Sequence, residues 1–455
     1  MRADGVHGSR VRSNDAHGNR TRRGHDLQGC HHGTRGASGM RAPLAPAALL
    51  TALAVAPAMI ALPGTPMTLA GAGAWLGWLG SGLIAASLLL MVREPGLAAW
   101  FGDLERMYRW HHGMGTLGYA VLLAHPVVLA AASLPAGPAA AWRVLSPAAQ
   151  SWHTLLGWLA LLALMAGLGA TFAVRLRYSL WRPLHATLGI GVLLGLAHAV
   201  AIDGVTAKSM LAVAAAVIAL GWRATRADRG GGACPYEVSA VDHPAPLTTE
   251  VTLRPLAAPI TVAPGQFVMA AFFDGPHFRG CGEYHPYTVS AVAPGGTLAL
   301  GIKALGDCTR NIQSIRTGVA ARVQGAYGSF LLNRAEAPEL WIAAGIGVTP
   351  FLALLRAQPV TRPTEFFYAF RSAESAPYLA ELAGLAAAQP RLHAHFLAMQ
   401  EDTEPLYALL ARVSDLTDRE VYMCGPPPLV DALGDWLRRR GVPPQHVHHE
   451  RFDFR

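Results

Sequence analysis

The chain has 455 residues, of which 52% are hydrophobic and 15% are charged, and its formal net charge is +8 at pH 7. It is long enough for two or three domains, and it is too apolar for an average soluble globular chain. We assign no nucleic-acid role to the positive charge, because most of it lies in the N-terminal tail and in loops between apolar stretches.

Residues 1–40 are rich in Arg, His and Gly and show no apolar periodicity. This composition predicts either a disordered basic tail, which could contact membrane lipid, or a non-native extension upstream of a start at Met40. No cleavable signal peptide is evident, so we expect the first apolar stretch to be retained.

Six apolar stretches follow, each close to the roughly 20 residues that cross a bilayer. They cover residues 43–62, 70–92, 107–132, 152–174, 181–202 and 207–222, and we assign residues 41–228 to a six-helix transmembrane bundle. Arginines follow the second, fourth and sixth stretches, whereas the other loops carry only Arg143 and Lys208. The positive-inside rule therefore predicts a multi-pass protein of the inner membrane with both termini in the cytoplasm.

Two pairs of histidines lie inside these stretches: His111 and His125 are fourteen residues apart, and His185 and His198 are thirteen apart. Ionisable side chains at membrane depth are costly, so two pairs indicate a functional site. Histidine is an axial ligand of haem iron, and two facing helices with two histidines each could hold two stacked haems. At about 1.5 Å of rise per residue, the members of a pair lie roughly 20 Å apart, with one haem near each leaflet.

Helix geometry favours His111 over His112 as the ligand. Around the helix axis, a spacing of fourteen residues brings His125 back to within roughly 40° of His111. The spacing of thirteen between His112 and His125 leaves an angular mismatch of roughly 140°. The second pair has this mismatch, so we expect its helix to be locally unwound, π-bulged or strongly tilted. Three glycines would permit this: Gly189, Gly191 and Gly195.

After Gly230 the pattern is that of a soluble protein. In residues 232–333, six β-type runs separated by turns predict a small antiparallel barrel. In residues 337–455, four strand-like runs alternate with helix-like segments, which predicts an α/β domain with a parallel sheet of the nucleotide-binding kind. The expected fold is therefore multidomain, with a helical bundle, a barrel and an α/β domain.

Three turns in the soluble part carry chemistry. GDCTRN, residues 306–311, opens a helix after a strand, so its backbone N–H groups and the Thr309 hydroxyl could hold a pyrophosphate, with charge from Arg310. In AAGIGVTPF, Gly345 and Gly347 let the backbone approach a second phosphate-bearing ligand. CGPPP places the Cys424 thiol at the carboxyl edge of the sheet, where ligands bind. The five cysteines have no cluster-type spacing, so we expect neither a structural disulfide nor an iron–sulfur cluster.

In this order, the motifs resemble those of the ferredoxin–NADP reductase superfamily. HPYTVSA resembles the flavin-binding HPF(S/T)xxS segment of ferric reductases and NADPH oxidases, and PGQF and GAYGSF also match. The resemblance implies FAD contacts at His285, Pro286, Tyr287, Thr288, Ser290, Gly306, Thr309, Arg310, Gly325 and Gly328. It implies NAD(P)H contacts at Gly345, Gly347, Thr349, Pro350, Cys424, Gly425 and Pro426.

Joined to the six spans, the paired histidines and the RYSLWRPLH segment, the chain is similar to the ferric reductase/NADPH oxidase family over about residues 44–455. Many NADPH oxidases end on an aromatic residue that stacks on the flavin, whereas this chain ends FDFR, in which Phe452 or Phe454 could take that place beside the catalytic Cys424. Arg371 could meet a ribose 2′-phosphate or be a solvated loop residue, which leaves NADPH and NADH both open.

The resemblance implies electron transfer from cytosolic NAD(P)H through FAD and two b-type haems to an acceptor on the outer face. The inner haem would lie between His111 and His185, and the outer haem between His125 and His198. Ferric iron chelates are our first choice of acceptor. The alternatives are dioxygen, as in a superoxide-producing NADPH oxidase, and a periplasmic protein partner.

Overall fold

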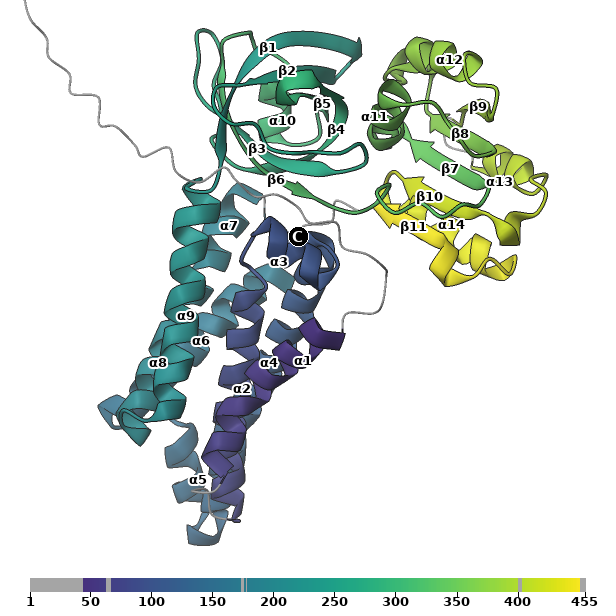
Figure 1. The fold of residues 1–455 in the computed structure, drawn as a ribbon. Coiled ribbons are helices and arrows are strands. Elements are labelled where there is room, and N and C mark those ends of the chain that lie inside the picture. Colours follow the sequence, from purple (N-terminus) through teal and green to yellow (C-terminus); the bar gives the residue numbers. More distant parts are fainter. Residues whose placement is uncertain (1–43, 63–66, 173–175, 177, 400–402, 451–455) are drawn as a thin grey trace, which may run out of the picture.

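A computed structural model describes residues 44–62, 67–172, 176, 178–399 and 403–450. Its described part forms a long helical bundle that carries a β-barrel at one end, with an α/β domain beside the barrel (Figure 1). The multidomain fold expected from the sequence is confirmed.

The bundle consists of long apolar helices and short connecting ones. Their bounds are α1 (Leu44–Ala61), α2 (Leu69–Leu89), α3 (Pro95–Phe101), α4 (Leu104–Ser133), α5 (Pro138–Leu145), α6 (Trp152–Phe172), α7 (Tyr178–Ala186), α8 (Leu188–Asp203) and α9 (Ala207–Trp222). A π-helical turn, Arg223–Asp228, extends α9. Six segments of the described chain are long and apolar enough to cross a membrane, which confirms a multi-pass membrane protein.

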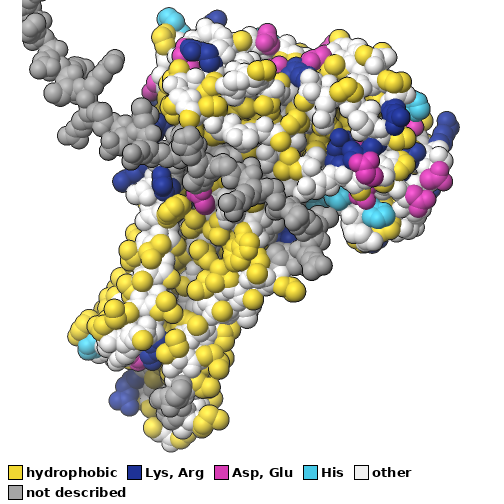
Figure 2. Space-filling model, viewed as in Figure 1, with side chains coloured by type: hydrophobic (Ala, Val, Ile, Leu, Met, Phe, Trp, Pro, Cys, Tyr) yellow, Lys and Arg dark blue, Asp and Glu magenta, His cyan; other side chains and the backbone are white. Residues whose placement is uncertain are grey.

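Small residues let the helices of the bundle approach one another closely. A Cβ added to Gly80 on α2 would lie 2.6 Å from Leu122 on α4, and one added to Gly82 would lie 2.1 Å from the backbone oxygen of Ala54 on α1. Bulky apolar side chains instead cover the outside of the bundle, as the yellow surface in Figure 2 shows. Such an outward apolar face suits a hydrocarbon surrounding.

The helix that carries the second histidine pair is broken between the two histidines. α7 ends at Ala186, Thr187 forms a turn, and α8 starts at Leu188. The Thr187 N–H donates to the backbone oxygens of both Pro183 and Leu184, each at 3.2 Å. The predicted irregularity is confirmed, and it lies just before the glycines that we expected to permit it.

The first soluble part is a closed antiparallel barrel with the strand order β1-β2-β5-β4-β3-β6. The strands are β1 (Cys234–Ala245), β2 (Thr248–Pro255), β3 (Phe267–Phe272), β4 (His285–Ala293), β5 (Thr297–Lys303) and β6 (Ala320–Tyr327), with α10 (Asp307–Ile312) between the last two. Val251, Val289, Leu300 and Val323 fill its core and are fully buried. All six runs that the sequence predicted as strands are found.

The second soluble part is a parallel sheet of order β11-β10-β7-β8-β9. Its elements are β7 (Glu339–Ala344), α11 (Thr349–Ala357), β8 (Thr364–Phe370), α12 (Leu379–Ala387), β9 (Leu392–Ala398), α13 (Glu404–Leu410), β10 (Glu420–Cys424), α14 (Pro427–Arg439) and β11 (Val447–Glu450). Four of its strands were predicted. The short, polar strand VHHE at β11 was not.

Strand β6 fastens the barrel to the bundle. The Gln324 amide donates to the backbone oxygens of Arg226 and Ala227, at 3.0 and 3.1 Å. The Tyr327 hydroxyl donates to the backbone oxygen of Arg93 at 3.1 Å, and the Arg93 guanidinium donates to Ala227 at 3.1 Å. These buried bonds set the barrel directly over the ends of α2 and α9.

Arg356 on α11 joins the α/β domain to the barrel. Its guanidinium donates to Glu250 on β2 at 2.8 Å and to Glu381 on α12 at 2.7 Å. The same guanidinium reaches the backbone oxygen of Ser290 on β4 at 3.2 Å. One cation thus bridges both soluble domains.

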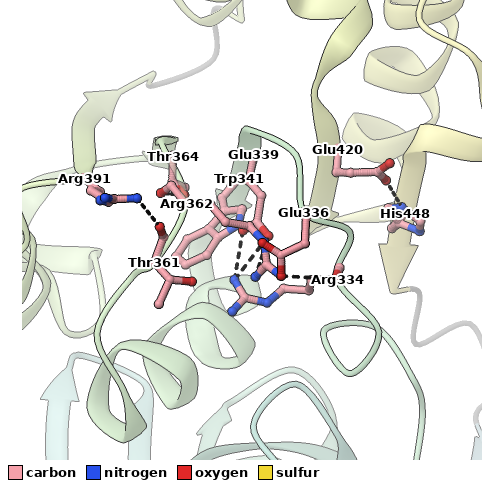
Figure 3. A network of polar contacts seen from close by, with 10 residues as sticks. All are labelled: Arg334, Glu336, Glu339, Trp341, Thr361, Arg362, Thr364, Arg391, Glu420 and His448. Carbon is pink, nitrogen blue, oxygen red and sulfur yellow. Dashed lines mark hydrogen bonds and ion pairs between the residues drawn. The ribbon is translucent and has the colours of Figure 1, made fainter.

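A second polar network lies at the amino ends of strands of the parallel sheet (Figure 3). Glu339 begins β7 and is fully buried, and its carboxylate accepts from Arg334 and from the Trp341 indole at 2.9 and 2.8 Å. Arg362 lies 3.7 Å away. Ligands of parallel sheets bind at the carboxyl ends of the strands, so this network at the amino end is structural.

Candidate functional site

The structure brings the two predicted inner histidines together. His111 on α4 and His185 on α7 have ring centroids 6.2 Å apart. Trp181 stacks on His185 at 4.8 Å and supports its ring. His112 borders the same space, with its ring 5.5 Å from that of His111.

Hydrogen bonds determine which nitrogen of each inner ring carries the proton. His111 Nδ1 lies 3.0 Å from the backbone oxygen of Ser87, which can only accept. His185 Nδ1 lies 3.3 Å from the hydroxyl of Thr171, which already donates to the Gly167 backbone oxygen at 2.8 Å. Both rings are therefore protonated at Nδ1, and Nε2 keeps the lone pair that a metal ion requires.

The outer histidines are held in the same way. His125 Nδ1 donates to the backbone oxygen of Gly73 at 2.7 Å, and His198 Nδ1 donates to that of His153 at 2.8 Å. On α2, Gly73 and Ser87 are fourteen residues apart, the same spacing as their histidine partners on α4. The hydrogen bond from a histidine on α4 to a backbone oxygen on α2 thus occurs at two depths in the bundle.

Two glycines leave room for the outer imidazoles. A Cβ added to Gly77 on α2 would lie 3.1 Å from the His125 ring, and one added to Gly157 on α6 would lie 3.1 Å from the His198 ring. These contacts are tighter than ordinary van der Waals packing. The sequence analysis did not single out either glycine.

One cavity of about 1050 Å³ extends from the inner histidines to the barrel. Its wall includes His111 and His185 from the bundle, His285 and Pro286 from β4, and residues 305–310 before and within α10. The outer histidine pair does not line it. The cavity is larger than the roughly 300–1,000 Å³ of a usual small-molecule site, so it has room for more than one cofactor moiety.

The turn before α10 has its own internal bonds. The Thr309 hydroxyl accepts from the backbone N–H groups of Leu305 and Gly306, at 2.9 and 2.8 Å. The Arg310 guanidinium lies 3.1 Å from Asp307. Thr309 therefore shapes this turn as a cap, while exposed Arg310 keeps positive charge at the cavity wall.

Residues from the barrel and the sheet converge at a second place. The Thr288 hydroxyl on β4 donates to Glu450 on β11 at 3.3 Å, and Glu450 is paired in register with Cys424 on β10. A Cβ on Gly328 would lie 3.3 Å from the Glu450 carboxylate, and Gly325 lies in the same strand region with a φ of +141°. The sequence analysis missed Glu450.

Burial controls the protonation of this group. It raises the pKa of Glu450 to about 8, against the lowering effect of the Thr288 hydrogen bond. It also raises the pKa of the Cys424 thiol well above its usual value. Both side chains are therefore largely uncharged at neutral pH.

The two predicted nucleotide turns lie side by side at the carboxyl edge of the sheet. A Cβ on Gly347 would lie 2.3 Å from the backbone oxygen of Cys424, and one on Gly425 would lie 2.9 Å from Ala344. Gly345 has a φ of +56°, which favours glycine. The neighbouring predicted contacts also fall here: Thr349, Pro350 and Pro426.

The remaining predicted contacts have different surroundings. Tyr287 faces the barrel core, and its buried hydroxyl has no hydrogen-bond partner among the described residues. Ser290 donates to Glu250 within the contact between barrel and sheet. Arg371 is exposed just after β8. Two aromatic residues expected at the flavin lie outside the described residues: Phe452 and Phe454.

The donors around the large cavity fit both a flavin dinucleotide and a haem. The unprotonated Nε2 atoms of His111 and His185 suit haem iron. Arg93, Arg223 and Arg310 line the wall, and guanidinium groups suit phosphates and carboxylates. The wall between these groups includes apolar side chains from five helices, as a flat ring system requires.

Comparison with known proteins finds family matches in both the membrane part and the soluble part of the chain. The family described as "Ferric reductase like transmembrane component" matches residues 76–196, and "Oxidoreductase NAD-binding domain" matches residues 341–435. The reductase component of propane 2-monooxygenase from Rhodococcus jostii (strain RHA1) is 27% identical over 227 residues, covering 46% of this chain and 61% of that relative. A flavohemoprotein from Burkholderia sp. (strain TH2) is 26% identical over 317 residues, covering 66% and 74%.

Among solved structures, the flavohem-like FAD/NAD-binding domain of nitric oxide dioxygenase from Vibrio cholerae O1 biovar El Tor matches with a TM-score of 0.42 and 21% identity. The match covers 48% of this chain and 97% of that one. This chain spans about three fifths of the length of the reductase components that it resembles. The chain thus joins a membrane domain that matches the ferric reductase-like transmembrane family to a soluble part that contains an oxidoreductase NAD-binding domain.

Proposed function

We propose that this chain is a flavocytochrome b that carries electrons from cytoplasmic NAD(P)H across the inner membrane to ferric iron chelates on the outer face. Its cofactors would be FAD and two b-type haems. His111 and His185 would hold the inner haem, and His125 and His198 the outer one. Both termini and the two soluble domains would then lie on the cytoplasmic side.

The single observation that carries this proposal is the continuous cavity between bundle and barrel. Its wall joins the inner histidine pair to His285, Pro286 and the turn at residues 305–310 without an intervening layer of protein. A continuous cavity of this kind would let a flavin and a haem approach each other directly, as electron transfer between them requires. Two separate sites on unconnected surfaces would not provide it.

When bound, FAD takes up a hydride and returns electrons one at a time, and a haem carries a single electron. The protein's own residues would position these cofactors. Ser87 and Thr171 hold the inner rings so that Nε2 points away from the helix that orients it. The paired turns at Gly347 and Gly425 would hold a nicotinamide beside the Thr288–Glu450 pair, where Cys424 would supply an uncharged, polarisable surface.

Ferric chelates are the proposed acceptor because the matching membrane family is described as ferric reductase-like. Reduction across a haem edge needs an acceptor nearby and no side-chain nucleophile or general base. A negative-inside membrane potential would favour outward electron flow by about 2.3 kcal/mol per charge per 100 mV.

Reoxidation of the reduced protein tests which electron acceptor it uses. The full chain, loaded with FAD and haem, is reduced anaerobically with NADPH in detergent, and then receives either ferric citrate or air-saturated buffer. We expect ferric citrate to discharge the haem bands without oxygen and to yield ferrous iron. Discharge by air alone, with superoxide formed, would replace this acceptor by dioxygen. No discharge by either would point to a protein acceptor.

A further inference from the structure

Three potential metal-ligating side chains from two segments of the chain meet at the wall of the large cavity. Cys281 lies in the loop between β3 and β4, His285 begins β4, and Cys308 lies in the first turn of α10. Their potential ligand atoms all lie within 4.8 Å of one another, and all three side chains are partly buried. None of the sequence motifs combined these three residues.

The distances fit a tetrahedral metal site. With Zn–S bonds of about 2.3 Å and Zn–N bonds of about 2.0–2.1 Å, a sulfur and a nitrogen ligand lie about 3.5 Å apart. In the structure, Cys281 Sγ lies 3.7 Å from His285 Nε2. Only small side-chain movements would therefore bring the donors to a common ion.

We propose that Cys281, His285 and Cys308 bind one soft divalent cation, with Zn²⁺ as the ion that fits best. Thiolate and imidazole ligands favour zinc, whereas magnesium and calcium prefer oxygen. Glu283 offers a fourth ligand, because its carboxylate lies 3.8 Å from His285 Nε2. Binding releases one proton from each thiol and transfers no electron.

The position of the site gives it a structural consequence. A cation held by Cys281 and Cys308 would fasten the β3–β4 loop to α10, across 27 residues of sequence. His285 and Cys308 both line the cavity that we assign to FAD. The cation would thus order one wall of that cavity, and its presence does not depend on which acceptor the protein reduces.

Zinc content tests the site directly. The full chain is purified without a polyhistidine tag, reduced with a phosphine, incubated with Zn²⁺, desalted and measured by mass spectrometry of the metal. Cys281→Ser and Cys308→Ser are compared with Cys234→Ala, a buried cysteine of β1 outside the cluster. Residues 1–40 contain further histidines and Cys30, which could bind zinc in every variant. The result therefore depends on the difference in zinc content between variants.

We expect wild type and Cys234→Ala to bind one more equivalent of zinc than either serine variant. X-ray absorption at the zinc edge of wild type, which needs no variant, should show sulfur at about 2.3 Å and nitrogen or oxygen at about 2.0–2.1 Å. Equal zinc in all four proteins would overturn the proposal. So would failure of the reduced wild type to retain zinc, including the case in which peptide mapping finds a Cys281–Cys308 disulfide instead.

Discussion

The Thr288 hydroxyl donates a hydrogen bond to the Glu450 carboxyl at 3.3 Å, although 162 residues separate the two in the sequence. Thr288 belongs to the barrel and Glu450 to the last strand of the parallel sheet. The bond crosses the seam between the two soluble domains beside Cys424. This seam is the place where the proposed function requires a nicotinamide and a flavin to meet.

Glu450 should make stability depend on pH. Its folded pKa of about 8 lies above the usual value of 4.5, because burial disfavours the charged form. The folded state therefore holds the proton more tightly, so stability should fall as pH rises from about 4.5 to about 8, by at most about 1.4 kcal/mol per pH unit. Glu450→Gln should flatten this dependence in thermal unfolding followed by fluorescence.

The matched control is Glu336→Gln, which replaces a carboxylate whose side chain is 94% exposed. It should leave the pH profile of unfolding as it is in wild type. If Glu450→Gln keeps the wild-type slope, Glu450 does not titrate in this range and the assignment of its protonation is wrong.

His198→Ala should remove the outer haem. The variant lacks the proposed outer ligand on α8, so haem content should fall from two to one per chain, and external ferric reduction should stop. Reduction of FAD by NADPH should persist, because the nicotinamide edge is unchanged. Pyridine haemochrome analysis measures the loss, and stopped-flow absorbance measures flavin reduction.

His153→Ala is the control for that experiment. His198 bonds to the backbone oxygen of His153, which alanine retains, so both haems should stay bound. Two haems in the His198→Ala protein would refute the ligand assignment.

Gly157→Ala should disturb the outer haem without touching a ligand. The new methyl group would lie 3.1 Å from the His198 ring, so the imidazole must move. We expect a changed redox midpoint of one haem, or its partial loss, in a spectroelectrochemical titration. Gly169→Ala on the same helix meets nothing within 4 Å and should titrate like wild type. Identical curves for the two variants would mean that Gly157 does not position His198.

Glu339→Gln should destabilise the α/β domain strongly. The change leaves Arg334 and Arg362 beside a neutral amide in a buried network, and breaking a buried ion pair costs about 3–5 kcal/mol. Urea unfolding of the α/β domain in the full chain measures the loss. Arg438→Gln removes an exposed pair and should change stability by less than about 1 kcal/mol. A similar small effect for Glu339→Gln would show that the network is dispensable.

Much of this architecture could be predicted from local sequence patterns. Long apolar runs mark the membrane helices, and alternating runs such as TTEVTLRPL mark barrel strands, because the period of burial is visible within a few residues. The two histidines of α4, His111 and His125, could be proposed for a similar reason, since a spacing of fourteen returns to nearly the same face of a helix. The Thr187 break also follows from helix geometry, although its position does not.

What the sequence concealed depends on contacts between distant segments. β11 is four residues long and contains two histidines, so it has no apolar pattern, and its strand form comes from pairing with β10. Glu450 becomes recognisable only when β11 reaches Thr288. The Cys281, His285 and Cys308 cluster was likewise hidden, because cysteine spacing alone does not reveal which loops meet.

The most direct test of the account is an anaerobic reduced-minus-oxidised absorption spectrum of the purified full chain, loaded with FAD and haem, after addition of NADPH. The account predicts b-type haem bands that appear after flavin bleaching and correspond to two haems per chain. Flavin bleaching without haem reduction, or a fully loaded preparation that binds no haem, would contradict the proposed path from the barrel through the paired histidines.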